Sequence, residues 1–146
     1  MTTWRPQNPG SAGDPGDWSS LPPPLLQFWT ERHLVTLTTL RADGRPHVVP
    51  VGIALDTQLH CAWAITSGGS RKARNLLERP DSHVAACQVD GARWSTIEGT
   101  ARVLSDAETV AYAEARYAER YRVPQTNPAR VAVRIDVLAI MHSARL

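Results

Sequence analysis

From residue 33 onward the chain contains short stretches in which apolar and polar side chains alternate, a period of two that is typical of β-strands. Such stretches predict six strands, over residues 33–40, 46–55, 59–66, 82–89, 93–104 and 130–141. Asp43-Gly44 and Asp90-Gly91 stand between successive stretches, where tight turns favour residues that accept a positive φ. Pro50 has no N–H to donate to a ladder, so it predicts an edge, a bulge or a ligand-facing position for its strand.

Three stretches predict helices instead. Pro24 suits the first turn of a short helix over residues 25–32. A second short helix is expected over residues 70–78 and a third over residues 106–121, where Ser105 as N-cap and Glu108 three residues later would form a capping box. Strands interrupted by helices without βαβ alternation predict a mainly β (α+β) fold, a small six-stranded antiparallel barrel, closed or split, with short helices.

Residues 1–24 differ from the rest of the chain. They hold more than half of the eleven prolines and little periodic apolar content, which predicts a Pro/Gly-rich arm, extended or disordered, ahead of one domain over residues 25–146. Trp4 and Trp18 are unusual in a solvated arm. They suggest that the arm docks on the body or on a partner subunit.

Composition excludes several classes of function. A net charge of +2 with scattered arginines argues against a nucleic-acid partner, and no apolar run reaches the roughly 18 residues of a membrane helix. No cluster has the spacing of metal ligands, and no catalytic motif is present, so the catalytic residues stay unassigned. Cys61 and Cys87 lie in apolar stretches, which predicts buried free thiols in a reducing cytoplasm.

Residues 66–76, TSGGSRKARNL, contain Lys72, the only lysine among sixteen basic residues. Two glycines allow the backbone to approach a ligand, and Ser70 is placed to cap the helix that follows. The hydroxyls of Ser67 and Ser70, the free N–H groups of the helix start and the charges of Arg71 and Lys72 would then converge as an anion site. An ordinary capped helix with solvated basic residues is the alternative.

Two further side chains are candidates for the same ligand. His47 lies on the strand that carries Pro50, where a surface or otherwise satisfied histidine is the alternative. Trp94 lies one strand away, where core packing competes with a role as the wall of a site for a flat aromatic ligand.

The stretch from Phe28 to Met141 resembles the split β-barrel family of FMN-binding, pyridoxamine-phosphate-oxidase-like (PNPOx-like) flavoproteins. Within that family it is similar to the actinobacterial flavin/deazaflavin oxidoreductases that use coenzyme F420. The resemblance rests on four segments in this order and spacing: LTTLRADGRPHVVPVG, ITSGGSRKARNL, DGARWSTIEGTARVL and RYAERYRVPQTNPARVAVRI. The last two look most similar to the branch of F420-dependent biliverdin reductases.

This resemblance implies a split-barrel cofactor-binding domain over residues 25–146, and a homodimer with a cofactor site at the subunit interface. It implies hydride transfer from reduced F420 to a small-molecule acceptor, with biliverdin as the candidate. Lys72 would contact the cofactor phosphate, and the other residues implied at the site are Ser67, Ser70, Asn75, Thr66, His47, Val49, Pro50, Val51 and Trp94. An FMN-dependent oxidoreductase of the same fold, and a non-catalytic carrier of F420 or a haem-related ligand, remain alternatives.

Overall fold

An eight-stranded antiparallel sheet curls into a half-barrel in the computed structural model, which describes residues 1–6 and 18–146. The strands are β1 (Thr2–Trp4), β2 (Val35–Leu40), β3 (Pro46–Val51), β4 (Ile53–Asp56), β5 (Cys61–Ser67), β6 (Ser82–Asp90), β7 (Arg93–Leu104) and β8 (Arg130–His142). Their order is β3-β2-β6-β7-β8-β5-β4, and β1 pairs with β8. The predicted fold class, a mainly β split barrel with short helices, is confirmed.

The predicted number of six strands is wrong for two reasons. One is β1, which lies within the predicted arm and pairs with residues 140–142 of β8. The other is Gly52, which divides the expected strand 46–55 into β3 and β4. A Cβ at Gly52 would lie 2.6 Å from Cε2 of Tyr117, so the chain can pass this point only without a side chain. At Gly52 the chain passes from β3, at one edge of the sheet, to β4, at the other edge. Because these two edge strands do not pair with each other, the barrel is split.

The helices are α1 (Pro23–Thr30), α2 (Arg71–Glu78) and α3 (Ala107–Arg120), with a 3-10 turn, η1 (Trp18–Ser20). α1 begins two residues before the expected start, because Pro23 and Pro24 occupy first-turn positions that need no N–H. α3 is capped by Asp106, whose carboxylate accepts a hydrogen bond from Thr109 N at 3.0 Å. The capping box predicted from Ser105 and Glu108 is therefore wrong, because the cap stands one residue later.

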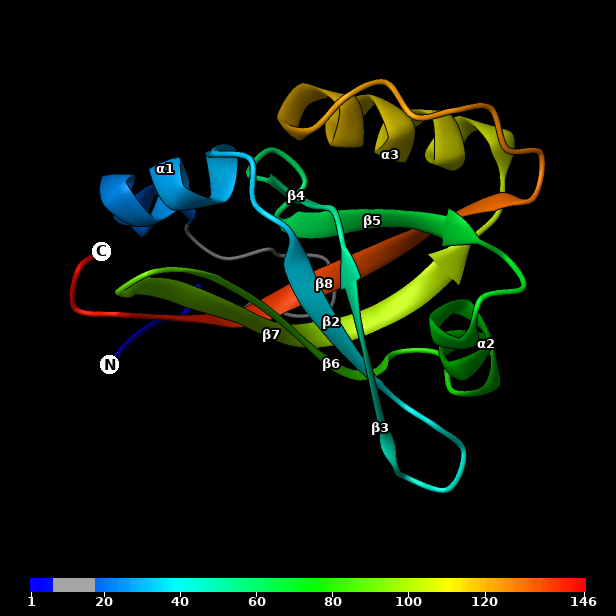
Figure 1. Ribbon diagram of the computed structural model, residues 1–146, viewed down its shortest axis with the longest axis horizontal. Coiled ribbons are helices and arrows are strands. Elements are labelled where there is room, and N and C mark those ends of the chain that lie inside the picture. The colour runs from blue at the N-terminus through cyan, green and yellow to red at the C-terminus, as the bar shows by residue number, and fades with distance from the viewer. Residues whose placement is uncertain (7–17) are drawn as a thin grey trace.

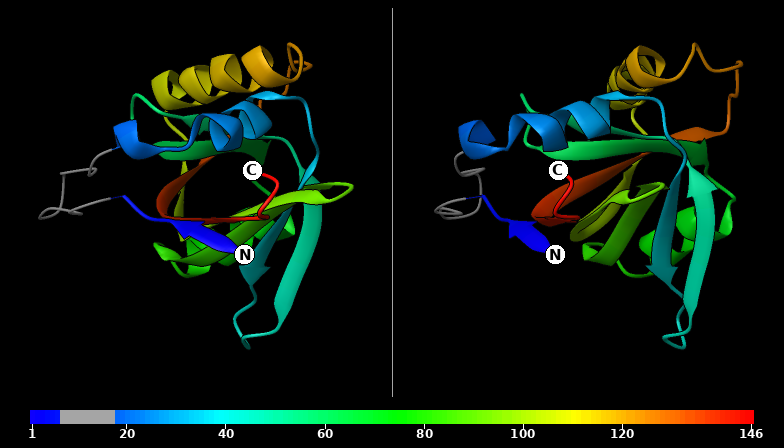
Figure 2. Two further views of the ribbon diagram at one scale, coloured as in Figure 1. Left: turned by 90° about the vertical axis from the view of Figure 1, so that its left-hand side faces the viewer. Right: turned by 60° about the vertical axis from the view of Figure 1, so that its left-hand side comes forward.

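The helices occupy different sides of the half-barrel. α1 and α3 lie on the same side of the sheet, and the β2–β3 hairpin projects away from the body (Figures 1 and 2). α2 lies at the end of the sheet opposite the β6–β7 turn (Figure 1). Among the described residues, no helix combines the length and apolar character needed to cross a membrane.

The interior of the half-barrel is one apolar cluster, and it includes the two tryptophans of the predicted arm. Trp4 and Trp18 are almost fully buried, with ring centroids 5.1 Å apart, and Trp18 stacks on His60. The expected docking of these side chains on the body is therefore confirmed. Residues 7–17 of the predicted arm lie outside the described residues, and the domain boundary at residue 24 stays a prediction.

The two cysteines differ in burial. Both are free; Cys61 is fully buried, and burial raises the pKa of its thiol to about 12. Cys87 is only partly buried, which corrects the prediction of two buried thiols. Its position on β6 pairs with Thr36, whose side chain is exposed on the outer face of the sheet.

That outer face carries apolar side chains that no other described part of the chain covers. Leu40 on β2, Val48 on β3 and Val89 on β6 are 37%, 56% and 68% exposed. Their positions alternate with buried residues such as Leu37 along the same strands, so they belong to the side of the sheet that faces away from the core.

Candidate functional site

The start of α2 is held by a hydroxyl pair. Ser70 is the N-cap, as predicted, and its Oγ accepts a hydrogen bond from Ala73 N at 3.3 Å. The Thr66 hydroxyl, at the end of β5, donates to the same oxygen at 3.0 Å. With both of these bonds accepted, Ser70 Oγ still has its own proton to donate.

The loop between β5 and α2 is tied to the segment that precedes β8. Asn127 Nδ2 donates to Ser67 Oγ at 2.9 Å, and Gly68 N donates to Ala129 O at 2.8 Å. A Cβ at Gly68 would lie 3.4 Å from Ala129 O, whereas one at Gly69 would meet no atom within 4 Å. Gly69 is thus the open position of this loop, and Ser67 is the anchored one.

The two cations of this turn have no carboxylate partner. Among the described residues, no ion pair involves Lys72 or Arg71. Lys72 is partly buried, and this burial lowers its pKa because the ammonium loses part of its hydration. Arg71 is exposed. An unpaired, partly desolvated ammonium at a helix start favours a bound anion.

Asn75 joins α2 to the β2–β3 hairpin. Its side chain is buried, and Nδ2 donates to Thr39 Oγ1 on β2 at 3.0 Å. Its Oδ1 is buried without a partner among the described residues. At the other end of the helix, Arg79 donates to Ala42 O in the hairpin. Asn75 therefore lies near the predicted site, where it holds the helix against the hairpin.

His47 lies beside this contact, because it is the register partner of Thr39. Its Nδ1 is buried and finds no hydrogen-bond partner in the described chain. Burial lowers the pKa of His47, and the positive charges of Arg41, Lys72 and Arg71 lower it further. The structure thus brings His47 near Arg71 and Lys72 at the start of α2.

The remaining predicted residues of β3 divide between its two faces. Val49 and Val51 alternate with Pro50, so they share the side of His47 and Pro50 is turned to the opposite side. β3 ends the strand order, which confirms the expectation that Pro50 marks an edge position.

Trp94 lies away from this group within the chain. It pairs with Val89 next to the β6–β7 turn, whereas Ser82, at the start of β6 just after α2, pairs with Ala101. Six residues of β7 lie between Trp94 and Ala101. Its backbone N–H donates to Ser143 Oγ at 3.4 Å near the end of the chain. One chain therefore does not bring Trp94 to Lys72.

Sequence reasoning missed three residues of this region. Arg41 follows β2 directly, two residues after Thr39, the register partner of His47, and its charge acts on His47, so the predicted turn at Asp43-Gly44 was a usable signal for it. Thr39 and Asn127 act through contacts with residues far along the chain, and no local pattern marks them. The described residues contain no cluster of metal-ligating side chains.

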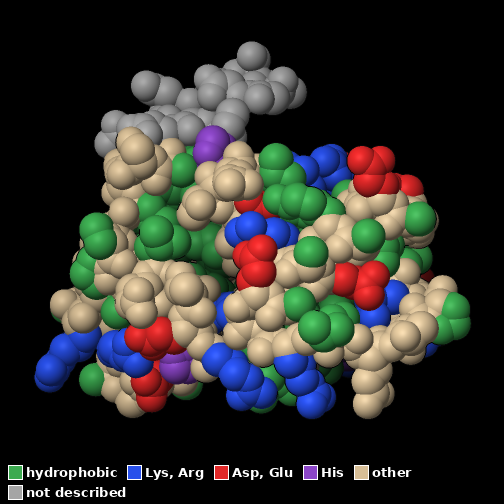
Figure 3. All heavy atoms as spheres, turned by 90° about the horizontal axis from the view of Figure 1, so that it is seen from above, with side chains coloured by type: hydrophobic (Ala, Val, Ile, Leu, Met, Phe, Trp, Pro, Cys, Tyr) green, Lys and Arg blue, Asp and Glu red, His purple; other side chains and the backbone are tan. Residues whose placement is uncertain are grey.

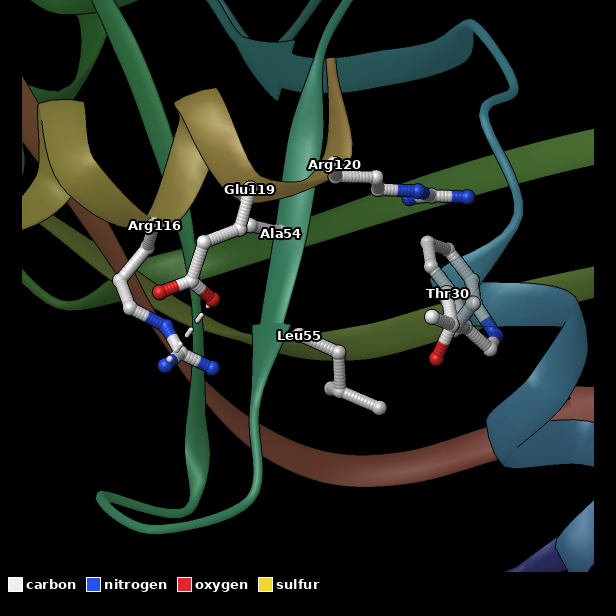
Figure 4. Close-up of a pocket in the computed structure, with 7 residues that line it drawn as sticks. Thr30, Ala54, Leu55, Arg116, Glu119 and Arg120 are labelled. Carbon is white, nitrogen blue, oxygen red and sulfur yellow. Dashed lines mark ion pairs between the residues drawn. The ribbon is translucent and has the colours of Figure 1, made fainter. Parts of the chain in front are cut away.

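A hollow of about 110 Å³ between α1 and α3 also has arginines in its wall (Figure 4). Arg116 forms an ion pair with Glu119 at 3.3 Å, and the Arg120 side chain points away from this pair toward α1 (Figure 4). The molecular surface over α1 and α3 mixes positive and negative side chains among apolar ones (Figure 3). The arginines of this hollow therefore suit an anion less well than the cations at the start of α2 do.

The Arg120 side chain is almost entirely buried, and its N–H groups donate hydrogen bonds to neutral acceptors. Its Nε donates to Glu31 O at 2.8 Å, its Nη1 to Ile53 O at 2.5 Å, and its Nη2 to Gln88 Oε1 at 2.7 Å. Nη2 also lies 3.4 Å from Phe28 O. The two α1-side carbonyls stand at the negative end of that helix, so Arg120 ties α1, β4 and β6 together.

A second hollow, of about 240 Å³, lies between α3 and the strands β5 and β8. Its polar groups are also satisfied: Tyr112 OH and Trp63 Nε1 donate to the buried Asp56 at 2.6 and 3.0 Å. Arg134 in its wall pairs with Asp136 at 3.0 Å. The buried carboxylate and the arginine of this hollow thus already have partners within the chain.

Comparison with known proteins agrees with the fold. The model of the pyridoxamine 5'-phosphate oxidase family matches residues 21–143. The F420H(2)-dependent biliverdin reductase of Mycobacterium tuberculosis (strain CDC 1551 / Oshkosh) is 51% identical over 121 residues, which cover 83% of this chain and 87% of that protein.

Solved structures show the same architecture. A conserved hypothetical protein from Mycobacterium tuberculosis superposes with a TM-score of 0.69 at 26% identity, covering 82% of each chain. An F420 reductase superposes with a TM-score of 0.64 at 23% identity, covering 79% of this chain and 94% of that one, a likeness of fold. With a half-barrel of the same kind and a family model that matches most of its length, the chain belongs to the pyridoxamine 5'-phosphate oxidase family.

Proposed function

We propose that the protein is an F420H2-dependent reductase that binds the cofactor phosphate at the start of α2 and reduces biliverdin or a similar conjugated acceptor. The observation that carries the proposal is the 51% identity to an F420H(2)-dependent biliverdin reductase over most of both chains. The unpaired cations at the start of α2 support it, because they suit a phosphodiester.

The groups around Lys72 fit a phosphate chemically. Ser67 and Ser70 each accept hydrogen bonds from protein donors, which leaves their hydroxyl protons for an anion. Lys72 supplies a positive charge without a competing carboxylate, and Arg71 supplies a second one at the rim. Gly69 leaves open space beside these groups, so a bulky phosphodiester can approach the backbone.

Bound reduced F420 would supply the hydride, and the acceptor would gain that hydride together with a proton. The task of this chain is then to hold and orient both molecules. We assign Val49, which is half-buried on the side of His47, and Thr66, beside Ser70, to the wall along the cofactor ring; Val51, on the same side, is buried in the core and is not assigned. Asn75 and Thr39 position α2 through their hydrogen bond of 3.0 Å.

We further propose a homodimer with the cofactor site at its interface. The uncovered outer face with Leu40, Val48 and Val89 is an apolar surface of the kind that a second copy buries. Pro50 is turned to this face as well. Trp94 would then reach a cofactor only if the partner subunit brings it there. We place the enzyme in the cytoplasm, where Cys61 and Cys87 would stay reduced.

The test is anaerobic mixing of the protein with F420H2 and biliverdin, followed by the absorbance of oxidised F420 and the loss of biliverdin. The proposal predicts that both change together and only when protein is present. Tight binding of F420H2 without oxidation by biliverdin or other conjugated acceptors would support a carrier instead. Binding of FMN without affinity for F420 would support the FMN-dependent alternative.

A further inference from the structure

His47 stands in a group of side chains that we call the α2–hairpin cluster: His47, Arg41, Arg71 and Lys72. Its members come from β3, from the residue after β2, and from the first turn of α2. The elements are held in place by the Asn75–Thr39 hydrogen bond and by the bond from Arg79 to Ala42 O. The cluster is therefore a fixed feature of the fold.

The charges around His47 are of one sign. β2, its strand neighbour, carries no ionisable side chain. α2 contributes Arg71, Lys72 and Arg74 near its start, and its one acidic residue, Glu78, stands at its far end. In the hairpin turn, Asp43 is already paired with Arg45 at 2.7 Å.

The His47 ring also has an unmet hydrogen-bonding need. Nδ1 is buried and has no partner among the described residues, although buried ring nitrogens are usually paired. Burial and three neighbouring cations oppose a positive charge on this ring, so the pKa of His47 lies below its usual value. An anion placed among the cations would reverse the electrostatic part of this effect.

We propose that an anion bound between α2 and the β2–β3 hairpin is held by His47 as well as by Lys72, and that His47 takes up a proton when the anion binds. The inference rests on the proposed function for the identity of the anion, the cofactor phosphate. It adds a pH-dependent ligand that Lys72 and the helix start do not supply.

The direction of the pH dependence follows from linkage. Binding raises the pKa of His47 from a value below about 6.5 to a higher one. Affinity is therefore fully enhanced below the pKa of the free protein, and the enhancement is lost as pH rises through the pKa of the complex. Between the two values affinity falls by up to about tenfold per pH unit.

The experiment follows the Cε1 proton of His47 by NMR during pH titration of the full chain, first free, then with F420, then with sulfate. Sulfate is the probe for the anion alone because its charge does not change near neutral pH. Calorimetric titration in two buffers of different ionisation enthalpy counts the protons taken up. His47→Gln keeps a polar side chain that cannot titrate, and His83→Gln, on an exposed position of β6, is the matched control.

We expect both ligands to raise the pKa of His47, and we expect wild type and His83→Gln to take up more protons on binding than His47→Gln does. Should F420 bind without changing the titration of His47, this inference is overturned while the proposed function stands. Should sulfate raise the pKa while F420 fails to bind, the coupling is supported and the proposed function is overturned. If neither ligand binds, both are overturned.

Discussion

The buried cations on the two sides of the half-barrel differ in whether they have partners. Arg120, the last residue of α3, is almost fully buried. It donates hydrogen bonds to carbonyls at the end of α1 and in β4 and to the Gln88 side chain. In the α2–hairpin cluster, Lys72 is partly buried, and no described carboxylate pairs with it. His47 Nδ1 and Asn75 Oδ1 are buried there and have no partner in the described part of the chain.

This difference separates stabilising residues from ligand-binding ones. A buried guanidinium with its donors paired holds the structure together, and removal of it leaves several acceptors unsatisfied. Burying an ammonium beside unpaired polar atoms costs free energy while no ligand is bound. A bound anion offsets this cost. Burial and positive charge alone do not identify a site; at the start of α2 they coincide with serine hydroxyls that can still donate and with cations that form no ion pair among the described residues.

The largest effect is expected on the paired side. Arg120→Met should lower the free energy of unfolding by about 2–5 kcal/mol, because Glu31 O and Gln88 Oε1 lose their donor and Ile53 O keeps only Tyr121 OH at 3.3 Å. Urea denaturation followed by fluorescence measures this. Arg122→Met, an exposed neighbour, is the control and should stay within about 0.5 kcal/mol of wild type. Equal stabilities of the two variants would contradict a structural role for Arg120.

Two glycines offer a similar contrast of packing. Gly52→Ala should cost about 1–3 kcal/mol, because its Cβ would press on Tyr117 and Tyr121 at 2.6 and 3.0 Å. Gly69→Ala, on the α2 side, has no atom within 4 Å of the added carbon and should be neutral or slightly stabilising. Chemical denaturation of both variants tests this. Equal loss in both would show that the loop before α2 is as tightly packed as the turn at Gly52.

The contact that positions α2 should have a smaller effect. Thr39→Val removes the acceptor of Asn75 Nδ2 and should lower the free energy of unfolding by about 1 kcal/mol. Amide hydrogen exchange should then become faster in α2 than in α3. Thr38→Val, one position along on the outer side of β2, is the matched control. Unchanged exchange in α2 would mean that other contacts hold this helix.

The smallest change in stability is expected at the lysine. Lys72→Met should leave the free energy of unfolding within about 0.5 kcal/mol of wild type, or raise it, because the variant buries no unpaired charge. Arg74→Met removes an exposed charge from the same helix and is the control. A loss of more than about 2 kcal/mol specific to Lys72→Met would place Lys72 with Arg120 among the stabilising residues.

Much of the fold could be predicted from the sequence, because strand alternation and the cap at Ser70 depend on neighbouring residues. The break at Gly52 could not, since the space beside Gly52 is filled by Tyr117, a residue far along the chain. β1 was missed because its pairing with β8 joins the two ends of the sequence. At the start of α3, Ser105 and Asp106 can both act as caps, and the backbone geometry selects Asp106.

The residues of the candidate site also fall into two groups, those that a local pattern identifies and those that it does not. Ser67, Ser70, Arg71 and Lys72 lie within one turn, so a local motif was enough to group them. The joining of α2 to β2 through Asn75 depends on how the helix packs on the hairpin, which no local pattern shows. Trp94 lies at the end of β7 next to the β6–β7 turn, whereas α2 precedes the opposite end of β6. A position on a neighbouring strand therefore did not place Trp94 near Lys72.

The most direct test of the central claim is a titration of wild type and Lys72→Met with F420 and FMN side by side. The ligand-site account predicts that wild type binds F420 more tightly than FMN. It also predicts that Lys72→Met weakens F420 binding by about 1–3 kcal/mol, roughly 5- to 150-fold, with the free energy of unfolding unchanged. An unchanged F420 dissociation constant in Lys72→Met would contradict it.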